Sequence, residues 1–418
     1  YEHKLITGSY SRAENGNVAL VAEIDLLNCN GDFLLAIGFG RKYSEAAFQA
    51  RASLLSGFNS ARAFYVHEWQ QWQKTLPVLD TLEHANSRLP ATSAAIIRTH
   101  TTKEPPGGLI SSLSIPWGLT KDEDDLGGYH LVWPRDVAEA AGALLAIGAQ
   151  KEVGEIIANL HSAQETDGSW PQSMWLDGLP YGQTSGIAEA AYPILLIDLA
   201  RREEALKSED LVRLWPMVRR AAGFIARIGP VSPAERWEDE PGYAPALLAV
   251  GIAAFLAAAD HADANGQTAL AGYFRKTADY WNATIERWTF IRDTELAREV
   301  DVEGYYVSTA SMHSTDSGAM LTHAAPVSEK STVFSRHLIS PTLLALVRLG
   351  LRMPDDPRVA ASLKLIDAML KMNIPQGPAW SRFNGDTYGE YADGRPFDGS
   401  GKGRVWPLLI GERAHYEL

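Results

Sequence analysis

Two glutamates are candidates for acid–base chemistry, because each lies in a tryptophan-containing segment beside a predicted loop. Glu238 directly follows Trp237, and Glu412 lies six residues after Trp406. Hydrolysis of a glycosidic bond uses two carboxyl groups of different protonation state, one to protonate the leaving oxygen and one to act on the opposite face of the sugar. Glu238 and Glu412, from different predicted helical hairpins, could form such a pair.

The neighbours of the two glutamates indicate which role each would take. Glu238 lies among further acidic residues within 235–240, and like charges favour a protonated carboxyl group, which suits a general acid. Glu412 has Arg413 beside it and Arg404 nearby, and positive charge favours an ionised carboxylate, which suits a general base. If neither glutamate is catalytic, the acidic residues around Glu238 are favoured by the dipole at a helix start, and Glu412 forms an ion pair with Arg413.

The predicted loops are rich in side chains that bind sugars. Residues 167–182, 234–243 and 378–399 concentrate Trp, Tyr, Asp, Glu and Arg. Such side chains line a concave site for a neutral polyhydroxy substrate, because rings stack on sugars and charged groups bind hydroxyls. The sequence contains neither GxxxxGK[ST] nor HExxH, nor clustered histidines at ligand spacing, which argues against a phosphorylated substrate and metal-dependent hydrolysis. We therefore expect no metal.

The composition argues against several other classes of protein. Thirty-eight basic and 51 acidic residues give a net charge of −13, which disfavours nucleic acid and anionic membranes as partners. Cys29 is the single cysteine, so an intramolecular disulfide framework and a cysteine-based zinc site are excluded. The longest uncharged stretch, 241–259, is rich in Ala with acidic residues at both ends, and we interpret it as a buried helix, not a membrane span.

A series of helices must hold the loops. Apolar residues at helical spacing predict helices over 91–101, 134–148, 152–165, 187–200, 208–227, 245–261, 267–291, 338–350, 356–373 and from about 404. Short connections alternate with long ones, and short connections join antiparallel neighbours. Every long loop then emerges at one end of a stack of helical hairpins, where sites are usually built. Twelve helices would close a toroid of six pairs, so we expect two more beyond Leu418.

The N-terminal region has a different pattern. Residues 17–26 and 32–39 predict two strands, and residues 44–74 predict one long helix. Two strands alone cannot cover their apolar face, so we interpret them as the end of a larger β domain. Residues 1–20 show no basic start followed by an apolar stretch, so no signal peptide is visible.

Six long motifs occur in order along the chain: SSLSIPWG (111–118), GGYHLVWPRD (127–136), DGSWPQSMWLDG (167–178), ERWEDEPGY (235–243), YGEYADGRPFDG (388–399) and GRVWPLLIGERAHYEL (403–418). Together they resemble the bacterial glucoamylases and glucodextranases of glycoside hydrolase family 15. The resemblance implies a mainly α fold, an (α/α)6 barrel preceded by a β-sandwich domain and a helical linker. The implied domains are 1–43, the last strands of the sandwich; 44–90, the linker; and 91–418, a catalytic domain without its last helices.

The resemblance also implies an activity. The family removes glucose from the non-reducing ends of α-glucans with inversion of the anomeric centre, using two glutamates and no cofactor. The first Glu after Trp in the WEE motif is the general acid, which is Glu238 here, and the Glu of the GER motif is the general base, Glu412. The substrate-binding residues that the resemblance implies are Trp133, Arg135, Asp136, Trp170, Trp175, Trp237, Asp239, Arg382, Asp386 and Trp406. Of these, Trp170, Trp175 and Trp406 could instead pack the wall of the barrel.

The chain departs from the family pattern in two places. Gly182 stands where the family usually has Trp, with Gly186 to Glu189 in place of a Gln-Leu-Asp-Glu run, and residues 308–332 differ throughout. The sequence therefore leaves open a preference for α-1,4 or α-1,6 linkages, a trehalase of the same family, and a non-catalytic glycan-binding relative. We expect a monomer acting on an α-glucan, with a secreted or periplasmic location favoured over the cytoplasm.

Overall fold

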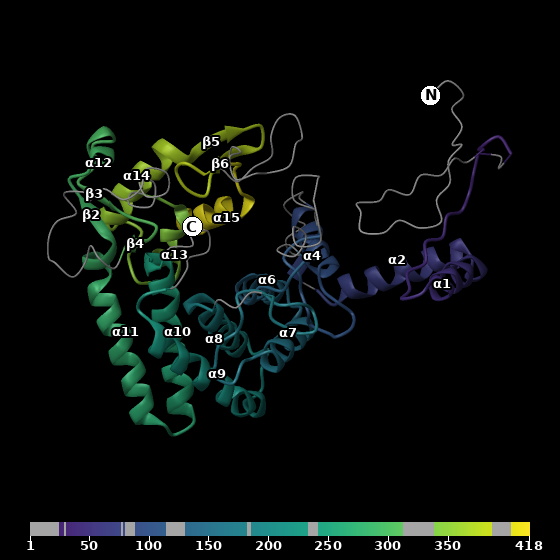
Figure 1. The fold of residues 1–418 in the computed structure, drawn as a ribbon, viewed down its shortest axis with the longest axis horizontal. Helices are drawn as coiled ribbons and strands as arrows, with labels where there is room; N and C mark the ends of the chain where they lie inside the picture. Colours follow the sequence, from purple (N-terminus) through teal and green to yellow (C-terminus); the bar gives the residue numbers. More distant parts are fainter. Residues whose placement is uncertain are drawn as a thin grey trace. The chain divides into compact units, whose positions relative to one another are not determined.

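The computed structural model describes residues 25–28, 31–76, 78–79, 88–113, 130–181, 185–232, 241–311, 338–386 and 403–418 (Figure 1). The chain divides into two compact units. The first comprises residues 1–96 with 121–125 and 146–149, and the second comprises the rest. Every candidate site residue belongs to the second unit.

The first unit contains α1 (Tyr43–Ser56) and α2 (Phe58–Lys74). The prediction of one unbroken helix over 44–74 is wrong, because the chain breaks at Gly57, which has φ 78° and ψ 136°. A residue with a Cβ atom avoids this conformation, and glycine adopts it without strain. Residues 32–40 contain no strand, and most of their expected partner, residues 17–24, lies outside the described residues.

The second unit is built mainly from helices, and their ends lie within about three residues of those predicted from apolar spacing. The exception is the five-residue α12, which lies in a predicted long connection and was not predicted. The four-residue 3-10 helix η4 continues directly into α13. The helices are α4 (Leu89–Thr99, which begins in the first unit), α6 (Pro134–Ala146), α7 (Gln150–Ser162), α8 (Ile187–Arg202), α9 (Ser208–Ile228), α10 (Pro245–Ala264), α11 (Thr268–Thr289), α12 (Glu295–Glu299), η4 (Pro341–Leu344), α13 (Ala345–Arg348), α14 (Pro357–Leu370) and α15 (Pro407–Glu417).

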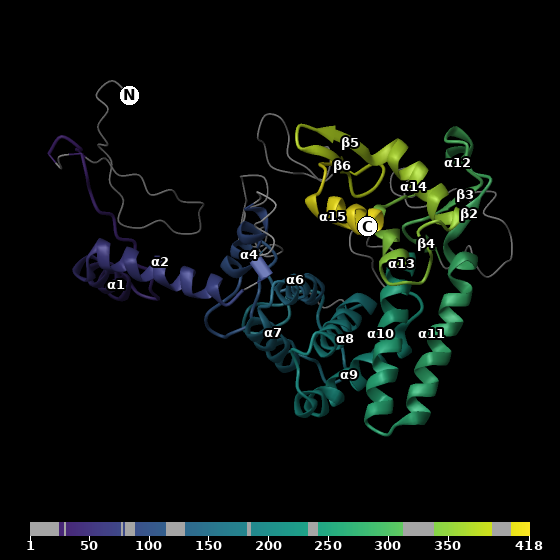
Figure 2. The same ribbon diagram turned by 180° about the vertical axis from the view of Figure 1, so that it is seen from behind.

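Helix α10 is the centre of the packing. It contacts α8, α9 and α11, and it lies side by side with α11 across a short turn (Figures 1 and 2). Among the helices described, α10 is the one long and apolar enough to cross a membrane, but 83% of its most apolar window is buried. A Cβ atom on Gly251 would lie 2.9 Å from the Trp281 ring, so the absence of a side chain lets α11 approach closely. The interpretation of this segment as a buried helix is confirmed.

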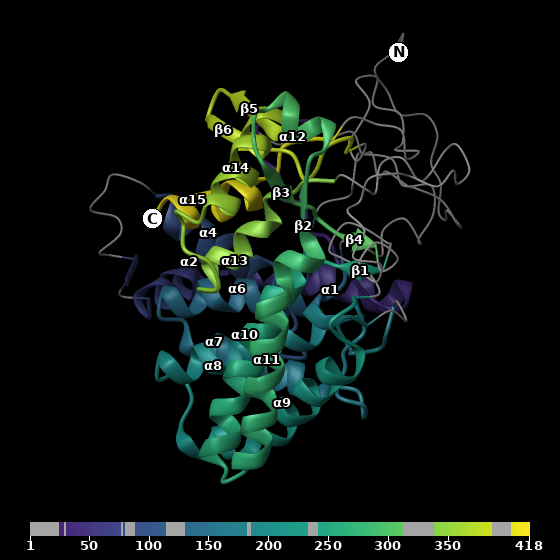
Figure 3. The same cartoon turned by 90° about the vertical axis from the view of Figure 1, so that its left-hand side faces the viewer.

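In the part of the chain that the structure describes, six short strands lie in or at the ends of the long connections, so the interpretation that only helices follow residue 90 is wrong. They form three antiparallel pairs, whose strands are labelled in Figure 3. Each strand has two to four residues, which is too short for an alternating pattern to appear in the sequence. The pairs are β1 (Gly242–Tyr243) with β4 (Ala310–Ser311), β2 (Phe290–Arg292) with β3 (Gly304–Tyr306), and β5 (Lys371–Ile374) with β6 (Gly377–Trp380).

A charged cluster ties α11 to β3 and to the segment after α13. The Glu286 carboxylate accepts hydrogen bonds from Arg352 Nε at 2.7 Å, Arg352 Nη2 at 2.9 Å and the Tyr306 hydroxyl at 2.7 Å. Arg352 also donates to Asn282 Oδ1 at 2.7 Å. Burial alone would raise the pKa of Glu286, but the hydrogen bonds from Arg352 and Tyr306 outweigh it and lower the pKa. The cluster is therefore ionised at neutral pH.

Replacing Glu286 with Gln should destabilise the protein by about 2 kcal/mol at pH 7, because it leaves the largely buried Arg352 without its charged partner. The folded pKa of Glu286 lies below its ordinary 4.5, so its contribution is complete above that value and is lost as the pH falls through the lowered pKa. Urea unfolding at several pH values measures this. The difference in unfolding free energy between wild type and Glu286→Gln should shrink below pH 4.5. A difference that stays constant with pH would contradict this role of Glu286.

Candidate active site

One cavity in the second unit is lined by alternate elements of the helical series: α6, α8, α10, η4 with α13, and α15. The volume is about 30 Å³, roughly the share of one water molecule in the liquid. The intervening helices α7, α9, α11 and α14 supply no lining residue. The lining residues are Arg135, Tyr192, Ala246, Leu247, Val250, Thr342, Ala345, Arg348 and Glu412.

The lining residues lie within the first two turns of their helices, except Arg348, which ends α13. Proline opens three of these helices, at Pro134, Pro245 and Pro407. Proline at the first position costs nothing, because that N–H has no partner within the helix, and its fixed φ already fits a helix. The helices α6, α10 and α15 therefore begin sharply, and Arg135 and Glu412 follow within the first two turns.

The predicted general base, Glu412, lies in this cavity. It is 9% exposed, and its Oε1 lies 3.5 Å from Nη1 of Arg348. The other side of the same guanidinium faces Glu139, with Nη2 3.7 Å from Oε1. Partial burial acts to lower the pKa of Arg348, but Glu412, Tyr192 and Glu139 outweigh it and raise the pKa. Arg348 is therefore a fixed positive charge beside Glu412.

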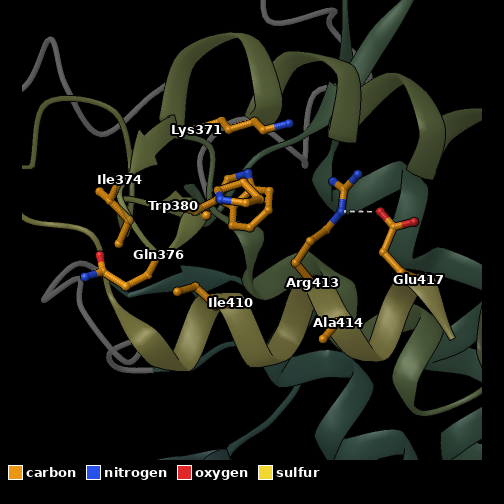
Figure 4. A pocket seen from close by; sticks show the side chains of 10 residues that line it. Lys371, Ile374, Gln376, Trp380, Ile410, Arg413, Ala414 and Glu417 are labelled. Atoms are coloured by element: carbon orange, nitrogen blue, oxygen red, sulfur yellow. Dashed lines mark hydrogen bonds and ion pairs between the residues drawn. The ribbon is translucent and has the colours of Figure 1, made fainter.

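Sequence reasoning chose a different cation for Glu412. Arg413 instead donates to Glu417 at 2.8 Å and to Asp367 at 3.1 Å, and its guanidinium lies 5.5 Å from the Trp380 ring centre. Figure 4 shows Arg413 directed into a separate groove of about 430 Å³ between α15 and the β5–β6 pair. Arg413 cannot face the same way as Glu412, because successive helical residues point about 100° apart. The alternative of a plain Glu412–Arg413 ion pair is therefore wrong, and so is the expectation that Arg413 supplies the positive charge beside Glu412.

The predicted pair Arg135 and Asp136 lies at the start of α6. Arg135 Nε donates to Asp136 Oδ1 at 3.2 Å, and Asp136 Oδ2 accepts from the Ser111 hydroxyl at 3.0 Å. The guanidinium lies 6.0 Å from the centre of the Trp133 ring, which is half-buried. The structure brings Arg135 and Glu412 to one cavity, and Asp136 and Trp133 flank Arg135.

The second predicted pair, Arg382 and Asp386, forms a bidentate ion pair. Arg382 Nε and Nη2 donate to the two carboxylate oxygens at 2.9 and 2.6 Å. The guanidinium lies 5.3 Å from the ring of Trp406, the residue directly before α15. These three residues form a cluster at the start of the helix that carries Glu412, and none of them lines the cavity.

The tryptophans expected as sugar platforms have different environments. Trp170 is fully buried, and its indole N–H donates to the Leu160 carbonyl at 2.9 Å. It therefore packs the wall and presents no face to a ligand. Trp175 is 43% exposed and packs edge-on against Tyr181, with centroids 5.5 Å apart. Met174 pairs with Val132 just before α6, which places Trp175 near the Arg135 end of the cavity.

The other predicted residues, Trp237, Glu238 and Asp239, lie outside the described residues, as do Gly182 and residues 312–332. The two ends of the 233–240 segment are described. Ser232 and Gly242 exchange backbone hydrogen bonds of 3.0 Å in both directions. The pairing of Ser232 with Gly242 lies beside the start of α8, because a Cβ atom on Gly186 would lie 3.5 Å from Ser232 Oγ.

Sequence reasoning missed Arg348 and Tyr192. Arg348 ends a four-residue helix, and Tyr192 packs on Ala188, Ala244 and Leu247 in the core. Neither lies in a recognisable motif. Their positions in alternate helices at the loop end of the hairpins were the only available signal.

Comparisons with known proteins show what the whole chain is similar to. Residues 1–74 match the profile of glucodextranase domain N, and residues 188–413 match that of glycosyl hydrolases family 15. A glucoamylase from Clostridium sp. (strain G0005) is 34% identical over 418 residues, which is all of this chain and 57% of that protein.

Solved structures show the same likeness. A bacterial glucoamylase complexed with acarbose matches with a TM-score of 0.77 and 32% identity, over 91% of this chain and 54% of that one. A glucoamylase from Saccharomycopsis fibuligera shares the fold, with a TM-score of 0.54 and 16% identity over 81% of this chain and 72% of that one. The predicted (α/α)6 architecture is confirmed. The chain spans little more than half the length of the two bacterial relatives.

The environments of Trp170 and Trp175 predict that the same substitution destabilises the protein by different amounts. Trp170→Phe removes a buried hydrogen bond and leaves a void, so it should cost about 1–3 kcal/mol of unfolding free energy. Trp175→Phe changes an exposed ring and should cost less than about 0.5 kcal/mol. Urea unfolding compares the two variants. Equal costs would contradict the assignment of Trp170 to the wall.

Proposed function

This chain belongs to glycosyl hydrolase family 15, and we propose that it hydrolyses α-glucosidic bonds at the non-reducing ends of glucans, releasing glucose with inversion. The observation that carries the proposal is the convergence of alternate helix starts on one cavity that holds both Arg135 and Glu412. A cationic hydrogen-bond donor and a largely buried carboxylate in one cavity can bind a sugar hydroxyl and act on a water beside it.

Glu412 is the proposed general base. An inverting enzyme activates a water on the face of the sugar opposite the leaving group, and its two carboxyl groups stand about 6.5–9.5 Å apart to admit that water. The cavity has room for about one water next to Glu412. Arg348, 3.5 Å from the Glu412 carboxylate, favours the ionised form that accepts a proton from the water.

Glu238 is the proposed general acid. It lies four residues before Gly242, so the chain holds it within about 14 Å of that residue. Gly242 pairs with Ser232 beside the start of α8 and precedes α10, whose first turns line the cavity. These described ends support a position for Glu238 near the cavity. It would donate a proton to the oxygen of the departing sugar.

Arg135 and Asp136 are proposed to bind the terminal glucose, as an arginine and a carboxylate suit the vicinal hydroxyls of a sugar. The apolar side chains of Ala246, Leu247 and Val250 form one wall of the same cavity, from α10. The proposed exo mode of attack is supported by the family and by the similar glucoamylases. The complex of a similar bacterial glucoamylase with acarbose supports an α-glucan as the substrate.

The proposal predicts β-glucose as the first product. Maltotetraose, isomaltotriose and trehalose are incubated with the protein, and the anomer is followed by NMR. Glu238→Gln and Glu412→Gln should each lower the rate by about two orders of magnitude or more, because each removes one proton-transfer group. Release from trehalose alone would identify a trehalase. Tight binding of acarbose without glucose release would identify a non-catalytic glycan-binding protein.

The contact between Arg348 and Glu412 predicts a second kinetic effect. Arg348→Met should lower kcat by about tenfold or more, because the base loses the charge that holds it ionised and in place. Arg413→Met is the matched control, since Arg413 adjoins Glu412 in sequence but faces the other groove. Its kcat should stay within about twofold of wild type. Equal losses in the two variants would contradict the role of Arg348.

A further inference from the structure

Glu189 is a buried carboxylate beside the cavity that the proposed reaction does not use. It is the third residue of α8, and only 5% of it is exposed. Burial dominates its titration and raises its pKa, although Arg135 and the backbone N–H groups act to lower it. Burial of a carboxyl group costs free energy, so other groups must stabilise Glu189 at this position.

Two contacts join Glu189 to the starts of two helices. Oε2 accepts a hydrogen bond of 3.0 Å from the N–H of Gly186, the residue directly before α8. Oε1 lies 3.8 Å from Nη1 of Arg135, in the first turn of α6. One carboxylate therefore caps α8 and faces the guanidinium that lines the cavity.

Capping alone does not explain the burial of Glu189. Asp210 has the corresponding position in α9, where its Oδ2 accepts the N–H of Lys207 at 3.1 Å. The Asp210 side chain is 28% exposed and pairs with Arg213 on the surface. A cap of the same kind thus forms in this protein without a deeply buried carboxylate.

Arg135 is held from two directions. Asp136 accepts a hydrogen bond from Nε, and Glu189 faces Nη1. Among the described residues, none accepts a hydrogen bond from Nη2. A guanidinium fixed along two of its three groups presents the third in one orientation, which lowers the entropy lost when a sugar hydroxyl binds.

We propose that Glu189 is a positioning residue for substrate binding: it fixes the guanidinium of Arg135 toward the terminal sugar and locks the start of α8 to the start of α6. This role rests on the proposed function, because it takes Arg135 as a sugar ligand. Glu189 itself does not touch the sugar.

The test is the kinetics of Glu189→Gln on maltotetraose, with Asp210→Asn as the matched control. The amide oxygen of the introduced glutamine can still accept the Gly186 N–H, so the cap and the fold are kept while the charge facing Arg135 is lost. We expect KM to rise about tenfold while kcat stays within about threefold of wild type, because the lost interaction stabilises the bound substrate and the transition state equally. Asp210→Asn should leave KM within about twofold. Urea unfolding of both variants verifies that they are folded.

A double-variant cycle shows whether the effect passes through Arg135. In an Arg135→Met background, Glu189→Gln should change KM by less than about twofold. A tenfold rise that persists in this background would overturn the proposal, as would a KM for Glu189→Gln equal to that of Asp210→Asn. An inactive wild type would overturn the proposed function, and the role of Glu189 with it. An active wild type with an unaffected Glu189→Gln variant would overturn the role of Glu189 alone.

Discussion

The burial of α10 is the constraint on which the site depends. This helix has almost no polar side chain over its first three turns, so it must be covered on nearly all sides, and α8, α9 and α11 cover it. Such packing fixes the position of α8 along the axis of α10. The first turns of α10 then form the apolar wall of the cavity, and the polar groups of α6, α8, α13 and α15 face that wall.

Two guanidinium groups, each between two carboxylates, organise the polar side of the cavity. Arg135 lies between Asp136 and Glu189, and Arg348 lies between Glu139 and Glu412. These six groups come from four helices, so the pairs also link α6 to α8 and, through Arg348, to α13 and α15. Buried ion pairs contribute little net stability, because desolvation offsets the attraction. Their value in this site is orientation: each arginine and the proposed base point in defined directions before a ligand arrives.

The sequence predicts the helices well because their apolar periodicity is long, and it predicts the hairpin alternation because loop lengths can be counted. It does not predict the break at Gly57, since a glycine inside a periodic run is compatible with a continuous helix. The six strands were missed because none exceeds four residues.

The sequence predicts the candidate site only in part. Arg135 and Glu412 are found through their motifs, and the structure places both at one cavity. The partner of Glu412 could not be found by adjacency, because Arg413 points about 100° away from it along the helix. Arg348, 64 positions earlier in the chain, takes that place through tertiary packing alone. Trp170 also carries a family motif, but its ring is used to fill the wall.

The central claim is that Arg135 and Glu412 act on the same sugar ring. A crystal structure of the Glu412→Gln variant with maltose bound tests it most directly. The account predicts the non-reducing ring beside Arg135 and Glu412, with its hydroxyls bonded to Arg135 and Asp136 and a water in the cavity between the introduced glutamine and the anomeric carbon. Maltose bound in the groove beside Trp380, or a ring that leaves Arg135 without contact, would contradict the account.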